Sequence, residues 1–315
     1  MKPHVLIAVN DFTEDHMAKI AEALQGWATW TRIDPSDEAR YREEIRRAQA
    51  VVGWPKAEWL LDSPVELLLL GSVGWDAYQG KGLERKPGFV LCNARGVMTA
   101  AVAEHLLAMM LALTRRLPRH FRDQSERRWE RCKTYDEVTG AVACVVGLGD
   151  IGTDIARRLA ALGMEVIGVR KNADRPHEYA SEIYPLSRLK EAVAKADHVV
   201  LILPENEETR GMVNAGVFAA MKPGAYFYNL ARGGIVDERA LCDALQSGRL
   251  AGAGLDVFAK EPLPADSPLW DLENVIITPH AGGRSVKEFD RFCSLVAANL
   301  RNWRQGAPLI NRVAL

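Results

Sequence analysis

The stretch VACVVGLGDIGTDIARRLAALG, residues 142–163, decides the fold of this chain. An apolar, β-branched run leads into Gly147, Gly149 and Gly152, and apolar residues at helical spacing follow. In such a turn the first glycine permits a tight bend, the second lets a pyrophosphate approach the backbone, and the third lets helix and strand pack closely. The helix N-terminus presents free N–H groups to a phosphate. The stretch therefore predicts a strand–turn–helix unit that binds a dinucleotide.

Apolar runs of strand length alternate with helical patterns on both sides of this unit. They are HVLIAVN, AQAVVGW, VELLLLGSVG and GFVLCNA before it, and MEVIGVR, HVVLILP, AYFYNLA, AGAGLDVF and NVIITPH after it. Continuous apolar strands that alternate with helices indicate parallel sheets covered on both faces. We therefore predict two parallel α/β domains, with a long helix from about Thr99 to Leu117 and a solvated, Arg-rich segment at 119–131 between them.

Composition narrows the classes of protein. The formal net charge is −1, so no overall field favours nucleic acid or an anionic membrane. The five cysteines are scattered without a C-x-x-C pair, which argues against a disulfide framework or a cysteine-rich zinc site. The first apolar run, Val5 to Val9, is shorter than a secretory signal, and the most apolar helix is interrupted by Glu104 and His105. We expect a cytoplasmic protein that binds neither nucleic acid, membrane nor metal.

The end of the strand MEVIGVR bears on which dinucleotide is bound. About 20 residues after the glycine motif an acid normally accepts the ribose hydroxyls of NAD, but Arg170 and Lys171 stand there instead. An acid would repel a 2′-phosphate, whereas an arginine binds one through two parallel hydrogen bonds. We therefore predict that NADP(H) is preferred and that NAD(H) is possible. The alternative is two basic residues on a solvated loop.

Three later stretches place reactive side chains just beyond predicted strands. Arg232 follows AYFYNLA, Asp256 and Glu261 follow the apolar run AGAGL, and His280 follows the apolar run VII. Ligands of α/β proteins bind outside the carboxyl ends of parallel strands. These residues are therefore candidates for one site, although spacing alone does not show that they meet.

Taken together, the motifs resemble the D-isomer-specific 2-hydroxyacid dehydrogenase family. The matching segments are GSVGWD, GVMTAAVAEHLLAMMLAL, VGLGDIG, NLARGGIVDERAL, AGAGLDVFAKEPLPADSPLW and NVIITPHAGG. They span essentially the whole chain, and their combination is far more specific than any one of them. The basic pair in place of the ribose acid is similar to the NADPH-dependent glyoxylate/hydroxypyruvate reductase branch of that family.

The resemblance implies catalytic and substrate-binding roles. Arg232 would bind the carboxylate and carbonyl of a 2-oxo acid, which suits a planar guanidinium. His280 would be the general acid during reduction and the base in the reverse direction. Glu261 would hydrogen-bond His280, hold its tautomer and stabilise the imidazolium. Backbone N–H groups of Val73 and Gly74 would help to hold the substrate carboxylate.

Other positions are expected at the cofactor or remain undecided. The residues expected to bind the cofactor are Gly147, Gly149, Asp150, Ile151, Gly152, Arg170, Lys171, Leu203, Pro204, Ala231, Asp256 and Gly282. Among them Asp256 would contact the nicotinamide end. For Glu104 and His105 we favour a structural role. Trp54 and Trp75 are equally compatible with the substrate pocket and with ordinary packing.

The resemblance also implies an arrangement of domains and a reaction. A substrate-binding, flavodoxin-like domain would comprise 1–95 plus 287–315, a dinucleotide-binding Rossmann domain 96–286, and the active-site cleft would lie between them. We expect a homodimer that reduces a small 2-oxo acid, similar to glyoxylate or hydroxypyruvate, to the D-2-hydroxy acid. Two alternatives stay open: an NAD-dependent dehydrogenase with another substrate, and a non-catalytic NAD(P)-sensing protein of the corepressor type.

Overall fold

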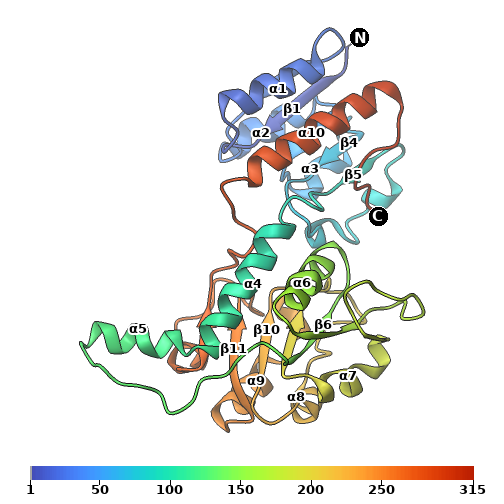
Figure 1. Cartoon of the computed structure of the whole chain (residues 1–315). Coiled ribbons are helices and arrows are strands. Elements are labelled where there is room, and N and C mark those ends of the chain that lie inside the picture. The colour runs from blue at the N-terminus through green and yellow to red at the C-terminus, as the bar shows by residue number, and fades with distance from the viewer. Residues whose placement is uncertain (1) are drawn as a thin grey trace. The chain divides into compact units, whose positions relative to one another are not determined.

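The computed structural model describes residues 2–315 and divides into two compact units (Figure 1). Unit 1 comprises Met1–Met98 and Ser285–Leu315, and unit 2 comprises Thr99–Arg284. Each unit is built on one parallel sheet, so the α/β class with two parallel sheets is confirmed. Within residues 2–315, no helix is long and apolar enough to cross a bilayer.

The sheet of unit 1 has five strands in the order β2-β1-β3-β4-β5. These strands are β1 (His4–Ala8), β2 (Thr29–Arg32), β3 (Ala50–Gly53), β4 (Leu67–Leu69) and β5 (Val90–Cys92). Because the central strands β1, β3 and β4 are almost wholly buried, they consist of continuous apolar residues. The edge strand β2, with the sequence TWTR, is half exposed and lacks that signature, which is why the apolar pattern did not predict it.

Helices cover both faces of this sheet. Helices α1 (Glu14–Leu24) and α10 (Glu288–Gln305) lie side by side on one face, where Phe12 packs against Phe292 (Figure 1). Helices α2 (Glu38–Ile45) and α3 (Ala57–Leu61) cover the other. The C-terminal helix thus completes the hydrophobic core that the N-terminal residues begin.

The sheet of unit 2 has seven parallel strands in the order β12-β11-β10-β9-β6-β7-β8. They are β6 (Val142–Val146), β7 (Glu165–Val169), β8 (Glu182–Tyr184), β9 (His198–Leu201), β10 (Ala225–Asn229), β11 (Leu250–Leu255) and β12 (Val275–Ile277). The chain runs from β6 out to β8 and then returns to β9 on the other side of β6. The strand order thus reverses at β6, which the glycine motif follows, and parallel α/β sheets bind their ligands beyond the strand ends at such a reversal.

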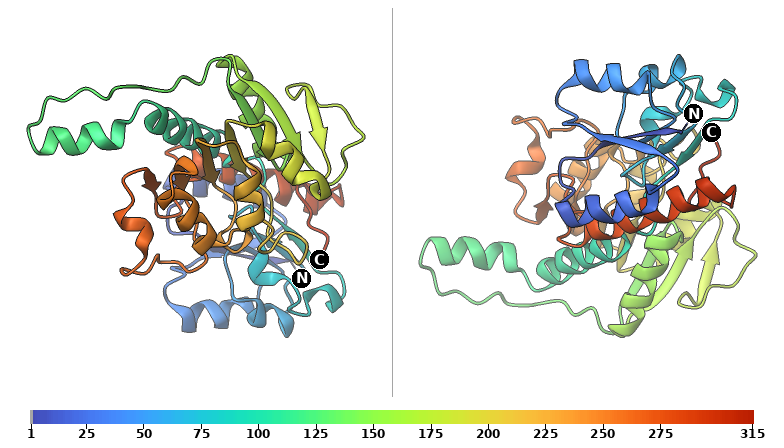
Figure 2. Two further views of the ribbon diagram at one scale, coloured as in Figure 1. Left: turned by 90° about the horizontal axis from the view of Figure 1, so that it is seen from below. Right: turned by 90° about the horizontal axis from the view of Figure 1, so that it is seen from above.

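Helices α4 (Thr99–Thr114) and α6 (Asp150–Ala161) pack on one face of this sheet, and α7 (Leu189–Lys195), α8 (Ala215–Ala220) and α9 (Glu238–Gln246) pack on the other. The sequence predicts that α4 reaches Leu117, but the helix ends at Thr114. Arg116 adopts a left-handed φ of +55° there, and a separate helix, α5 (Leu117–Ser125), begins with Pro118 in its first turn. Figure 2 shows α5 extending away from the sheet of unit 2.

Candidate active site

The glycine turn after β6 has the close approaches that its sequence predicts. Gly147 has a φ of +108°, and a Cβ on Gly152 would stand 1.8 Å from the carbonyl oxygen of Gly147. A Cβ on Gly149, in contrast, would meet no atom within 4 Å. Gly149 is also the N-cap of α6, and it has no side chain with which to cap that helix end. Open space beside the N–H groups of a helix N-terminus fits the pyrophosphate of a dinucleotide.

The two basic residues after β7 differ in their contacts. The Arg170 guanidinium donates to the backbone carbonyls of Arg175 and Pro176, and its buried Nε has no hydrogen-bond partner among the described residues. Lys171 is 87% exposed and lies 3.7 Å from Glu208. Arg170 therefore folds onto its own loop in this structure, a contact that the sequence did not indicate, while Lys171 points into solvent.

The loop after β9 approaches the turn after β6 and the loop after β10. A Cβ on Gly147 would lie 2.4 Å from the carbonyl oxygen of Ile202, next to the expected cofactor residues Leu203 and Pro204. Glu205 follows them, forms an ion pair of 2.9 Å with Arg210, and places its carboxylate against Gly234. The expected cofactor residues that follow β6 and β9 thus lie together at the carboxyl ends of these strands, and Glu205 contacts the loop that carries Arg232.

Arg232 lies just after β10, between the buried Ala231 and the 3-10 turn Gly233–Ile235. Its backbone carbonyl accepts a hydrogen bond of 3.1 Å from the amide of Asn229, which is itself buried. A Cβ on Gly233 would overlap the backbone of Phe258 at 1.9 Å. Only glycine allows this approach, so it fixes the loop of Arg232 against the segment that comes after β11.

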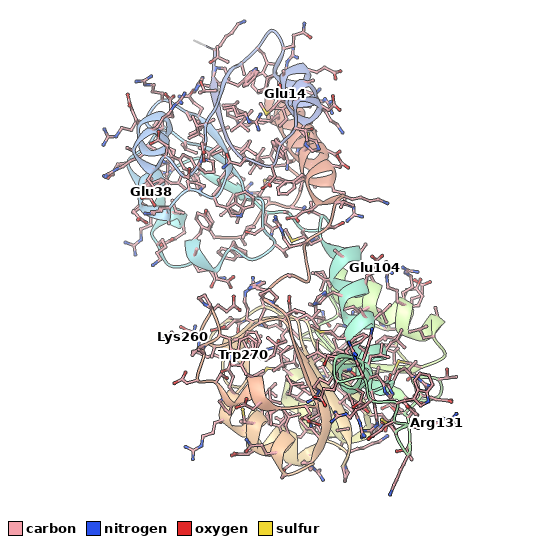
Figure 3. The ribbon with its side chains drawn as sticks, turned by 90° about the vertical axis from the view of Figure 1, so that its left-hand side faces the viewer. Glu14, Glu38, Glu104, Arg131, Lys260 and Trp270 are labelled. Atoms are coloured by element: carbon pink, nitrogen blue, oxygen red, sulfur yellow. The ribbon has the colours of Figure 1, made fainter. Side chains whose placement is uncertain are left out.

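His280 and Glu261 form the closest pair of predicted catalytic residues. His280 Nδ1 lies 2.8 Å from Glu261 Oε2, and Glu261 Oε1 accepts the backbone N–H of Phe258 at 3.1 Å. Because a carboxylate only accepts, Nδ1 carries the proton of the His280–Glu261 bond. Nε2 is then the ring nitrogen left for a substrate. Both side chains lie on loops at the carboxyl ends of β11 and β12; Figure 3 labels Lys260 and Trp270 in the first of these loops.

Asp256, the first residue after β11, is buried and engaged with the backbone around His280. Its carboxylate accepts the N–H groups of Ala281 and Gly282 at 2.8 and 2.9 Å, and the hydroxyl of Thr278 at 2.6 Å. His105 of α4 reaches the same hydroxyl, with Nε2 2.9 Å from Thr278 Oγ1. The sequence favours a structural role for His105, and no spacing links it to Thr278, which lies 173 positions away.

The remaining candidates belong to unit 1. Val73 and Gly74 lie in the loop after β4, where their carbonyls accept hydrogen bonds from Asn93 and Ser72. Trp54 covers Gly71, since a Cβ on that glycine would stand 2.3 Å from the indole. Trp75 packs against the core beneath α2 and α3. Both tryptophans thus have packing contacts within their unit.

No three His, Cys, Asp or Glu side chains among residues 2–315 gather closely enough to hold a metal ion. The titratable side chains here meet in two pairs, His280 with Glu261 and His105 with Asp256, and Arg232 follows the neighbouring strand β10. An acid–base pair, with an arginine after the neighbouring strand and a glycine turn of the dinucleotide-binding type at the same end of the sheet, is suited to transferring a proton to an anionic substrate.

Several known proteins are similar to this chain. The model of the D-isomer-specific 2-hydroxyacid dehydrogenase NAD-binding domain matches residues 107–282. A glyoxylate reductase of Korarchaeum cryptofilum is 32% identical, over 97% of this chain and 94% of its own. A D-3-phosphoglycerate dehydrogenase of Archaeoglobus fulgidus is 37% identical over 72% of this chain, but the matched part spans only 43% of that longer protein.

A solved structure is similar over the whole chain. It is an NADPH-dependent glyoxylate/hydroxypyruvate reductase of Sinorhizobium meliloti, in complex with NADP and sulfate. It is 27% identical, with a TM-score of 0.82 that covers 99% of this chain and 98% of the other.

Proposed function

The chain belongs to the D-isomer-specific 2-hydroxyacid dehydrogenase family, and we propose that it reduces a small 2-oxo acid, similar to glyoxylate or hydroxypyruvate, with NADPH as the preferred cofactor. The observation that carries the proposal is the His280–Glu261 pair at 2.8 Å, with Arg232 on the adjacent strand end. A protein that only senses a nucleotide has no need of this acid–base pair.

The residues divide the work of reduction. The nicotinamide, when bound, supplies the hydride. Arg232 binds the substrate carboxylate through parallel hydrogen bonds, which orients the carbonyl. His280 gives its Nε2 proton to the carbonyl oxygen as negative charge develops there, and takes it back in the reverse direction. Glu261 stabilises the imidazolium before the transfer and keeps Nδ1 protonated after it.

Unit 2 holds the dinucleotide in this proposal. The turn Gly147–Gly152 accepts the pyrophosphate at the N-terminus of α6. Arg170 and Lys171 stand at the end of β7, where the ribose of the cofactor is recognised in this fold. Lys171 is exposed. When the cofactor binds, the Arg170 guanidinium gives up its hydrogen bonds to two loop carbonyls and donates to the 2′-phosphate instead. The similarity to a reductase solved with NADP supports the same preference. For Val73 and Gly74, binding of the substrate carboxylate stays a prediction.

We further propose a homodimer in which the segment of residues 117–135, here called the α5 arm, meets the partner. Trp129 and Phe121 in the arm are 95% and 62% exposed. Large aromatic side chains are enriched at the cores of protein interfaces, and the described residues leave most of these two uncovered. Light scattering of the wild-type protein and of Trp129→Glu tests this, since a monomeric wild-type protein would refute the proposal.

The test of function is the initial rate with glyoxylate and with hydroxypyruvate, each with NADPH and with NADH. Rapid turnover with NADPH and little with NADH is expected. Turnover with NADH alone would overturn the cofactor preference but not the reaction. No turnover of these or of larger 2-oxo acids, among them the product of phosphoglycerate oxidation, would overturn the proposed reaction.

The variant Arg170→Asp tests the phosphate contact directly. It is expected to lower kcat/KM for NADPH by about 100-fold, because a charge-assisted bidentate bond is replaced by repulsion. The value for NADH should stay the same or rise, because an acid at this position can accept the ribose hydroxyls. Arg239→Ala, which removes an exposed arginine on α9, is the matched control and should change neither value. An unchanged preference in Arg170→Asp would refute the assignment.

A further inference from the structure

His280 has an unusual backbone conformation. Its φ is +52°, in the left-handed region that a residue with a Cβ rarely adopts because its Cβ crowds the following carbonyl oxygen. Two carbonyls hold the turn: His280 N–H lies 2.9 Å from the oxygen of Asp256 and 3.0 Å from that of Thr278. The direction in which the imidazole points therefore depends on the atoms that keep this turn closed.

The Asp256 side chain closes the same turn from the other end. It accepts the N–H groups of Ala281 and Gly282, the two residues after His280, and the hydroxyl of Thr278, two residues before it. Three of its roughly four acceptor positions are thus in use. A Cβ on Gly282 would lie 2.8 Å from Asp256 Oδ2, so the backbone has closed tightly around the carboxylate.

His105 is the donor in its hydrogen bond with Thr278. The Thr278 hydroxyl has one proton, and it goes to Asp256 Oδ1 at 2.6 Å because a carboxylate only accepts. Thr278 Oγ1 must then be the acceptor in its 2.9 Å contact with His105 Nε2, so His105 donates. The chain of hydrogen bonds runs from His105 through Thr278 to Asp256, and such chains strengthen each member.

Helix α4 sets the position of His105. One turn further along, Met109 lies over Gly254 of β11, where a Cβ would be 2.9 Å from the methionine sulfur. Gly254 precedes Asp256 by two residues, so α4 packs on the strand that ends just before this carboxylate (Figure 1). A packed helix is a rigid element from which to hold a loop in place.

We propose that His105 is a positioning residue for the reaction: through Thr278 it fixes the Asp256 carboxylate and so the turn that presents His280 to Glu261. It acts through these residues without being the proton donor. The kinetic test of this inference rests on the proposed function, whereas the structural test needs only the protein without substrate.

The kinetic test compares His105→Gln, whose amide N–H reaches about as far as Nε2, with His105→Asn, which keeps the polarity but is one methylene shorter. The expected result is a kcat about tenfold lower in His105→Asn and in Thr278→Val, with KM within about twofold of wild type and the Gln variant near wild type. The double variant His105→Asn/Thr278→Val should be no slower than either single variant, because both break the same chain. Glu104→Gln, which changes the exposed neighbour labelled in Figure 3, is the control.

The inference would be overturned by a wild-type kcat in His105→Asn or by an equal fall in kcat in the Gln and Asn variants. It would also be overturned if the double variant lost kcat by the product of the two single effects. The NMR signal of the His280 Nδ1 proton in the free protein gives a readout without substrate. It should broaden or vanish in His105→Asn and Thr278→Val and persist in His105→Gln. Persistence in all three variants would overturn the inference, whereas absence of turnover in the wild type would overturn only the proposed function.

Discussion

Replacing Gly152 by alanine is expected to lower stability, whereas replacing Gly149 is expected to weaken NADPH binding. At Gly152 a Cβ would stand 1.8 Å from the Gly147 carbonyl oxygen, 1.2 Å inside the 3.0 Å below which real Cβ contacts essentially never fall. The obstacle is backbone, so α6 must move away from β6. At Gly149 the Cβ meets nothing within 4 Å, and its φ of −81° suits any residue.

The magnitudes derive from these contacts. Gly152→Ala should destabilise unit 2 by about 3 kcal/mol, the upper end for overpacking, which is roughly a 10 °C fall in Tm for a unit of this size. Gly149→Ala should change stability by less than about 1 kcal/mol. However, its methyl group occupies the space into which a pyrophosphate must come, so NADPH should bind at least about tenfold more weakly.

The assay is thermal unfolding of both variants with and without NADPH. At about 100 times the wild-type Kd, NADPH stabilises the wild type by about 2.7 kcal/mol, and a tenfold weaker affinity in Gly149→Ala would reduce this gain to about 1.4 kcal/mol or less. A Gly149→Ala protein that binds NADPH as the wild type does would refute the placement of the pyrophosphate. A Gly152→Ala protein with the wild-type Tm would refute the close packing of α6 on the turn.

Three further outcomes are expected. His280→Ala should lower kcat by about 10²–10⁴-fold with little change in the Kd of NADPH, and near wild-type turnover would remove His280 from the mechanism. Glu261→Gln should lower kcat and leave the Tm almost unchanged, because the amide can accept the Nδ1 proton but lacks the charge; a rate equal to the wild type would contradict this. Burial lowers the pKa of His198 from 6.5 to about 4, so the unfolded chain binds a proton that the folded chain refuses. The free energy of unfolding should therefore fall on acidification from about pH 6.5 to 4, by on the order of 3 kcal/mol more in the wild type than in His198→Gln. Urea titrations at each pH measure it, and an equal fall in the two proteins would refute the prediction.

Much of the fold could be predicted because its signals are local. The central strands are buried on both sides and therefore appear as apolar runs, and the glycine turn depends on steric limits within a few residues. The strands that the pattern did not predict, β2 and β8, are sheet edges with exposed residues. The helix α5 lies in an Arg-rich segment whose composition resembles a solvated loop.

The sequence likewise predicts part of the candidate site, and the tertiary structure decides the rest. From the sequence alone, Arg232, Asp256, Glu261 and His280 were each placed after a strand, since the residues just beyond a parallel strand lie at the ligand-binding edge of the sheet. Only the tertiary structure decided which of them touch. The strand order puts β10, β11 and β12 side by side, and glycines at the crossing points let their loops close on one another.

Long-range contacts were beyond the sequence for a physical reason. His105 meets Thr278 across 173 residues because α4 packs on β11, and Arg170 turns to carbonyls five and six residues on because its loop curls back. Both contacts depend on where whole elements or loops come to rest, which is set by the summed packing of many side chains. Local steric and hydrophobic patterns specify the elements and the residues at their ends, whereas the packing of those elements specifies which end residues share a hydrogen bond.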